Sequence, residues 1–129
     1  MRSSSRGTVF QSVLGSDRQS CAFPQVAVLP GGRWLVGIRA APTKGGNDGQ
    51  HVMLSFSDDE GSTWSPASSP FVPPVLDGRP GQFRAVALTA LGKKRVLATL
   101  YWVDYSNPAL PFFNETTQGL LDSRIMFSR

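Results

Sequence analysis

The feature that most constrains the fold is a near-repeat of two hairpin-like segments. The first, FPQVAVLPGGRWLVGIRA, covers residues 23–40, and the second, FRAVALTALGKKRVLATLYW, begins 60 residues later and covers residues 83–102. Each has an apolar strand, a short turn (PGG or LGKK) and a second apolar strand, which is the pattern of an antiparallel hairpin. A similar strand follows each hairpin, HVMLSF at 51–56 and RIMFSR at 124–129. The chain therefore contains two copies of one small antiparallel unit.

The expected strands are residues 24–29, 33–40, 51–57, 64–68, 83–89, 95–102 and 123–128. Glycine and proline are frequent, at 13 and 10 of 129 residues, which favours strands and turns over helices. Repeated small antiparallel sheets predict an all-β fold of the β-propeller type, built from four-stranded blades. We expect one incomplete propeller domain over residues 1–129, with blade one at about 20–70 and a truncated blade two at about 80–129. Since two blades cannot close a ring, the missing blades are expected from the rest of a longer chain or from a partner.

Composition argues against several function classes. The formal charge of +4 comes from scattered basic residues, and only Lys93-Lys94-Arg95 forms a cluster, at an expected turn, so no nucleic-acid partner is predicted. No segment is long and apolar enough for a membrane span, and the first ten residues lack an apolar signal core. The expected location is cytoplasmic if Met1 is the true start. The single cysteine, Cys21, excludes an internal disulfide and is interpreted as a small buried hydrophobe.

The stretch SDDEGSTW at residues 57–64 is acidic enough to suggest a catalytic or metal-binding loop. We interpret it as a structural turn, in which Gly61 supplies a positive φ and Asp59 accepts hydrogen bonds from its own turn. Ser57 and Thr63 then join the strand ends, and Trp64 covers the turn. The acids between these positions, Asp58 and Glu60, should point to solvent. The alternative of a calcium loop is disfavoured because Gly61, Thr63 and the later Pro70-Phe71 break the required spacing of oxygen ligands. No metal or cofactor is expected.

The same stretch resembles the Asp box, S-x-D-x-G-x-T-W, of sialidases and other BNR-repeat propellers, and it matches all five specified positions. The hairpin before it is similar to the first blade of a bacterial sialidase-type propeller, and the resemblance covers about residues 20–129. It implies a six-bladed ring in which the Asp box is structural and lies away from the active site. The active site of that family lies at the central channel.

The resemblance also implies candidate site residues. Arg39 and Arg84 are placed to bind the substrate carboxylate, because a planar guanidinium meets a carboxylate with two hydrogen bonds. Asp48, in the loop at 41–50, is the candidate acid/base catalyst. Each has a plainer alternative: a surface ion pair for Arg39, a pairing with a nearby carboxylate for Arg84, and an ordinary solvated loop for Asp48. The arginine of the family's Phe/Tyr-Arg-Ile-Pro motif is missing, because that position reads Phe23-Pro24.

Two functions are therefore expected. The first is a fragment of a sialidase-like exo-glycosidase that hydrolyses terminal sialic acid or a related sugar. Its tyrosine nucleophile, the glutamate partner and the remaining arginines would lie beyond Arg129, so this chain alone should be inactive. The second is a non-catalytic BNR-repeat propeller that binds a carbohydrate or a protein, which the missing arginine favours. A carbohydrate ligand is expected in both cases unless the module binds protein alone.

Overall fold

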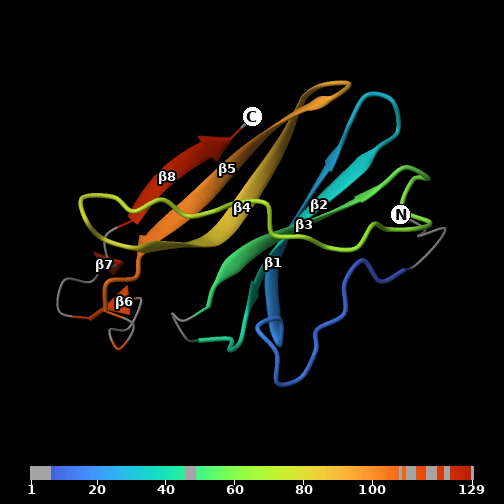
Figure 1. Ribbon diagram of the computed structural model, residues 1–129. Helices are drawn as coiled ribbons and strands as arrows, with labels where there is room; N and C mark the ends of the chain where they lie inside the picture. The colour runs from blue at the N-terminus through green and yellow to red at the C-terminus, as the bar shows by residue number, and fades with distance from the viewer. Residues whose placement is uncertain are drawn as a thin grey trace.

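The computed structural model describes residues 7–45, 49–107, 109, 113–115, 119–120 and 123–128. These residues form an all-β structure with two three-stranded antiparallel sheets (Figure 1). The first sheet contains β1 (Ser20–Val28), β2 (Trp34–Ala41) and β3 (His51–Ser57), and the second contains β4 (Gly81–Gly92), β5 (Arg95–Asp104) and β8 (Ser123–Ser128). Two short strands, β6 (Phe113–Asn114) and β7 (Gly119–Leu120), pair with each other. The described residues include no helix of the length and apolarity that a membrane span requires.

The two sheets have the same order, with the second strand of each in the centre. In the first sheet β2 pairs with both neighbours, so that Arg39 lies opposite Ala22 on β1 and Val52 on β3. The β1–β2 turn is closed by a hydrogen bond from Leu29 N to Arg33 O of 2.8 Å. Its glycines take the positive φ values for which glycine has no steric penalty. The repeat of hairpins expected from the sequence is confirmed.

The sequence prediction of a fourth strand at 64–68 is wrong. This segment does run beside β3, and its backbone bonds include one from Ser65 N to Phe56 O of 2.8 Å and a two-bond bridge between Ser68 and Leu54. Pro66 interrupts this pairing because proline has no backbone N–H to donate to a ladder. The first unit therefore has three strands, not four.

The core lies between the two sheets. β4 contacts β1, β2 and β3, so the second sheet lies across the first through its own first strand (Figure 1). The buried cluster draws on β3, β4 and β5 and consists of Val52, Phe83, Val86, Ala98, Leu100 and Trp102. Gly37 of β2 permits the close approach, because a Cβ there would lie 2.6 Å from Cγ1 of Val86. Trp102 is fully buried, and its indole N–H donates to the carbonyl of Pro74 at 3.0 Å.

The outer strands β1 and β8 expose large apolar side chains. Val26 is 58% exposed, and Ile125 and Phe127 are 70% and 69% exposed. Cys21, which was expected to be buried, is exposed as well. The reason is its place near the start of β1, which is an edge strand and pairs with β2 only. Partial desolvation of its thiol nevertheless raises the pKa, and the positive charge of Arg39 opposes that rise.

Candidate functional site

Arg39 lies near the end of β2, and its side chain is almost fully buried. The residue is 2% exposed, so the surface position required by a surface ion pair is not observed. Its Nε donates to Oε1 of Gln50 at 2.9 Å, and its Nη2 donates to the carbonyl of Thr43 at 3.2 Å. Both acceptors are neutral, so neither of them cancels the charge of the guanidinium. A buried guanidinium that keeps its charge in this way raises the electrostatic potential around it, which attracts anions.

Two glutamines connect this arginine to the second sheet. The backbone N of Gln50 donates to Oε1 of Gln82 at 2.8 Å, and both glutamines are buried. The hydrogen bonds therefore run from β2 through the residue before β3 to the start of β4. Buried polar groups need such partners, because an unsatisfied one costs about 1–3 kcal/mol. This network holds the end of β2 against the start of strand β4.

Arg84 lies where β4 departs from regular pairing. Phe83 pairs with Trp102 and Ala85 pairs with Tyr101, so the register shifts by one residue at Arg84. A bulge of this kind re-aims a side chain and is frequent near binding sites. β1 has an irregularity at the corresponding place, between Ala22 and Gln25.

Electrostatics place the two arginines near each other. Burial lowers the pKa of Arg39, and the positive charge of Arg84 lowers it further. Burial also lowers the pKa of Arg84, while Tyr101 raises it. Both guanidinium groups remain charged at neutral pH, because the pKa of arginine starts above about 12. Arg39 and Arg84, the two residues that the resemblance gave as substrate-binding, are thus close enough to interact electrostatically.

Phe23 stands where the resemblance would have placed another arginine. It occupies the irregular part of β1 with a φ of 54°, and it is 53% exposed. A positive φ is uncommon for a bulky residue, so this position is a strained one that the surrounding pairing holds in place. A half-exposed aromatic ring there cannot supply the charge of an arginine.

Asp48, the predicted acid/base catalyst, lies outside the described residues, so its role stays a prediction. The described groups near the loop include His51, whose Nδ1 contacts the carbonyl of Gly49 at 3.0 Å. Its Nε2 lies 3.9 Å from Oδ2 of Asp17. The sequence did not indicate this pair or the two glutamines. No sequence motif marks the His51–Asp17 pair or the Gln50–Gln82 pair, because the partners come from separate segments that meet only in the folded chain.

Residues 57–64, which we call the Asp box after the motif that they resemble, form the turn that their pattern predicts. Asp59 is its centre: it accepts from the Ser57 hydroxyl at 2.7 Å, from Thr63 N at 2.8 Å and from the Thr63 hydroxyl at 2.6 Å. Gly61 has a φ of 86°, and its N donates to the Ser57 hydroxyl at 2.8 Å, while its carbonyl accepts from the Trp64 indole at 3.1 Å. The hydrogen bonds from Thr63 and Ser57 lower the pKa of Asp59 to about 2. All three of these hydrogen bonds to the carboxylate therefore come from residues of the same turn.

The expectation that Asp58 and Glu60 face solvent is confirmed, since both residues are exposed. The sequence did not indicate that Asp58 also forms a two-bond ion pair with Arg33, with distances of 2.5 Å to Nε and 2.8 Å to Nη2. The cause is the short β1–β2 turn, which brings Arg33 to the same end of the sheet as the start of the Asp box. Asp58 nevertheless keeps a 58% exposed side chain.

In residues 7–45 and 49–107 and the short described stretches after them, no three His, Cys, Asp or Glu side chains gather in a way that could hold a metal ion.

Comparison with protein-family models, with curated proteins and with solved structures gave no match.

Proposed function

We propose that this chain is part of a sialidase-like β-propeller that binds a terminal sialic acid or a related acidic sugar. One observation carries the proposal: the buried guanidinium of Arg39 is held by the neutral acceptors Gln50 and Thr43, and the charge of Arg84 is close enough to lower its pKa. Two cations that repel each other across a partly buried site are stabilised by an anion between or beside them. A sugar carboxylate is such an anion, and guanidinium groups can bind it with paired hydrogen bonds.

The six-bladed ring and the position of the site at its channel follow from the resemblance, and they remain part of the proposal. The exposed apolar side chains of β1 and β8 support it, since neighbouring blades would cover Val26, Ile125 and Phe127. In the catalytic form of the proposal, Asp48 transfers the proton, and the nucleophile and the remaining arginines come from other blades. The 129-residue chain then binds the sugar but does not hydrolyse it.

The second candidate is a non-catalytic propeller that binds a carbohydrate or a protein. The observation that favours it is the half-exposed Phe23 at the position where the family carries an arginine. With one arginine fewer, the carboxylate would be held more weakly, and an aromatic face would be available for an apolar patch of a sugar or a peptide. Both candidates share the anion-binding pair and differ in whether chemistry follows.

The test is a titration of the ¹⁵N-labelled chain with N-acetylneuraminic acid, followed by the amide shifts of residues 39 and 84. Replacement of one arginine, Arg39→Gln or Arg84→Gln, should weaken binding about ten-fold or more, since a charge-assisted hydrogen bond contributes about 1.5–3 kcal/mol. Arg95→Gln is the matched control, because it removes the same charge at the start of β5, away from the proposed site. It should change affinity less than two-fold. Equal losses in all three variants, or no saturable shift, would reject the proposed site.

Hydrolysis by this chain alone tests where the catalytic groups of the first candidate lie, since neither candidate predicts turnover by the 129 residues. We expect no turnover of a fluorogenic sialoside by the 129-residue chain. Turnover that is abolished by Asp48→Ala would instead show that this chain holds the catalytic groups, contrary to the proposal that they lie in other blades.

A further inference from the structure

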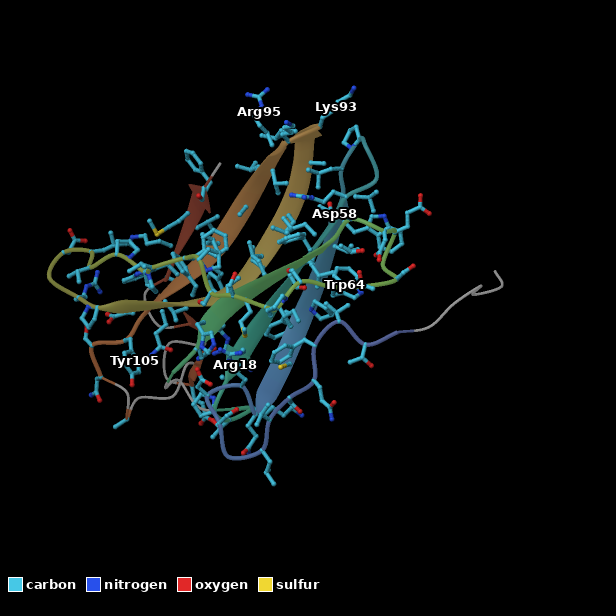
Figure 2. The ribbon with its side chains drawn as sticks, turned by 45° about the vertical axis from the view of Figure 1, so that its right-hand side comes forward. Arg18, Asp58, Trp64, Lys93, Arg95 and Tyr105 are labelled. Carbon is cyan, nitrogen blue, oxygen red and sulfur yellow. The ribbon has the colours of Figure 1, made fainter. Side chains whose placement is uncertain are left out.

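A second basic site lies at the opposite end of the two sheets. The β1–β2 turn and the β4–β5 turn border a cavity of about 580 Å³, whose charged lining is Arg33, Asp58, Lys93 and Lys94. Arg39 and Arg84 lie at the other end of β2 and near the beginning of β4, so they belong to a separate site. Figure 2 shows Lys93 and Arg95 at the tip of the β4–β5 hairpin, with Asp58 on the same side of the molecule.

The guanidinium of Arg33 is held in place before any ligand arrives. It makes two hydrogen bonds to Asp58, and its Cζ lies 4.7 Å from the ring centre of Phe56. The paired bonds fix the plane of the group, and the ring supports one of its faces. A side chain fixed in this way loses little conformational freedom when it binds an anion. Asp58 neutralises one charge but does not cover the cavity, since both side chains stay more than half exposed.

The lysines supply the remaining charge. Lys93 and Lys94 are consecutive and exposed, directly after Gly92, whose φ of 152° turns the chain between β4 and β5. Their ammonium groups are mobile point charges that can adjust to an anion at the cavity mouth. Three cations against one carboxylate give the lining a net charge of +2. The volume is in the range of small-molecule sites and is larger than a bare oxyanion needs.

We propose that this cavity binds a phosphate or sulfate monoester of about the size of a monosaccharide. A phosphate monoester carries close to two negative charges at neutral pH and has oxygens that accept several hydrogen bonds. It therefore matches the net charge of the lining, and a sugar-sized body fills the volume that the oxyanion leaves. The site does not depend on the proposed sialidase-like function, because it shares no residue with the Arg39–Arg84 pair.

The test is a titration of the ¹⁵N-labelled 129-residue chain, first with inorganic phosphate and then with glucose, glucose 6-phosphate and glucose 6-sulfate. We expect saturable shifts of the Gly31, Lys93 and Lys94 amides with both monoesters, tighter binding than with inorganic phosphate, and none with glucose. Tighter binding of one ester identifies the phosphate or the sulfate as the preferred group. Absence of saturable shifts at these amides, or equal affinity for inorganic phosphate and both esters, would overturn the proposal.

Single charge removals localise the site. Lys93→Ala and Lys94→Ala should each weaken glucose 6-phosphate binding about five-fold, the effect of one exposed charge pair of about 1 kcal/mol. Arg95→Ala is the matched control, because it removes one charge from the same hairpin without lining the cavity, and it should change affinity less than two-fold. Asp58→Asn should tighten binding, since it keeps an acceptor for Arg33 and raises the net charge. Equal weakening by all three charge removals, or weaker binding by Asp58→Asn, would show that only diffuse attraction is present.

Discussion

Gly37→Ala tests whether the two sheets pack as the structure describes. Gly37 lies in β2 at the point where β4 crosses, and an added Cβ would lie 2.6 Å from Cγ1 of Val86 and 3.3 Å from side-chain carbons of Leu54 and Leu88. Ordinary carbon contacts are about 3.5–4.0 Å, so the sheets would have to separate by about 1 Å. Val86 is 4% exposed and belongs to the buried core cluster, so its displacement would disturb the packing around it.

The expected cost has two parts. Overpacking of a core by one carbon costs about 1–3 kcal/mol. The loss of glycine's freedom in the unfolded chain returns about 0.5–1 kcal/mol. The net destabilisation is therefore about 1–2 kcal/mol, which for a chain of 129 residues lowers Tm by roughly 4 °C per kcal/mol.

The assay is urea unfolding followed by tryptophan fluorescence, with Gly45→Ala as the control. Gly45 lies in a loop with nothing within 4 Å of its added Cβ, so this variant should not be destabilised. Val86→Ala supplies a second comparison, because it removes the atom that clashes. In that background Gly37→Ala should cost nothing, which gives a coupling energy of about 1–2 kcal/mol in the double-mutant cycle. An equal cost of Gly37→Ala in both backgrounds would refute the contact between β2 and β4.

Three further predictions concern the turn and the core. The hydrogen bonds that lower the pKa of Asp59 to about 2 stabilise the fold above its unfolded value of 3.8, so this stabilisation should be lost as the pH falls through about 2; acid unfolding of Asp59→Asn should lack that component. Gly61→Ala should destabilise by about 1–2 kcal/mol in urea titrations, because its φ is +86° and its Cβ would meet the Trp34 ring at 3.0 Å. Trp102→Phe should cost about 2–4 kcal/mol by circular dichroism, since it leaves a small cavity and an unsatisfied Pro74 carbonyl; a loss below 1 kcal/mol would contradict the burial of that indole.

Short-range patterns accounted for most of the fold. The alternation of apolar runs and turn residues located six strands. The repeat of two hairpins corresponds to the two sheets, each of which has its second strand in the centre. The failure at 64–68 has a local cause that the sequence contains, because Pro66 interrupts any ladder there. The exposure of Cys21 was missed for a different reason. Edge and central strands have similar apolar sequences, and only the pairing order distinguishes them.

The candidate site was less accessible from the sequence. Arg39 and Arg84 could be proposed only through the resemblance to the sialidase family, which relates each of them to a strand end of its unit. The role of Gln50 and Gln82 could not be predicted, since an isolated glutamine in a loop or at a strand start carries no pattern. The ion pair of Asp58 was missed because its partner is 25 residues earlier. Such contacts depend on the angle at which turns leave a sheet, which no single-sequence pattern encodes.

The hydrogen bonds of the Asp box have a consequence for folding order. Each bond made by the side chains of Ser57, Asp59, Thr63 and Trp64 within the turn spans at most four residues along the chain. Contacts this local can form on the microsecond scale of hairpins. Grafted between two other antiparallel segments, the eight residues would keep the hydrogen bonds around Asp59, whereas Asp58 would lose its ion pair because Arg33 lies outside the turn.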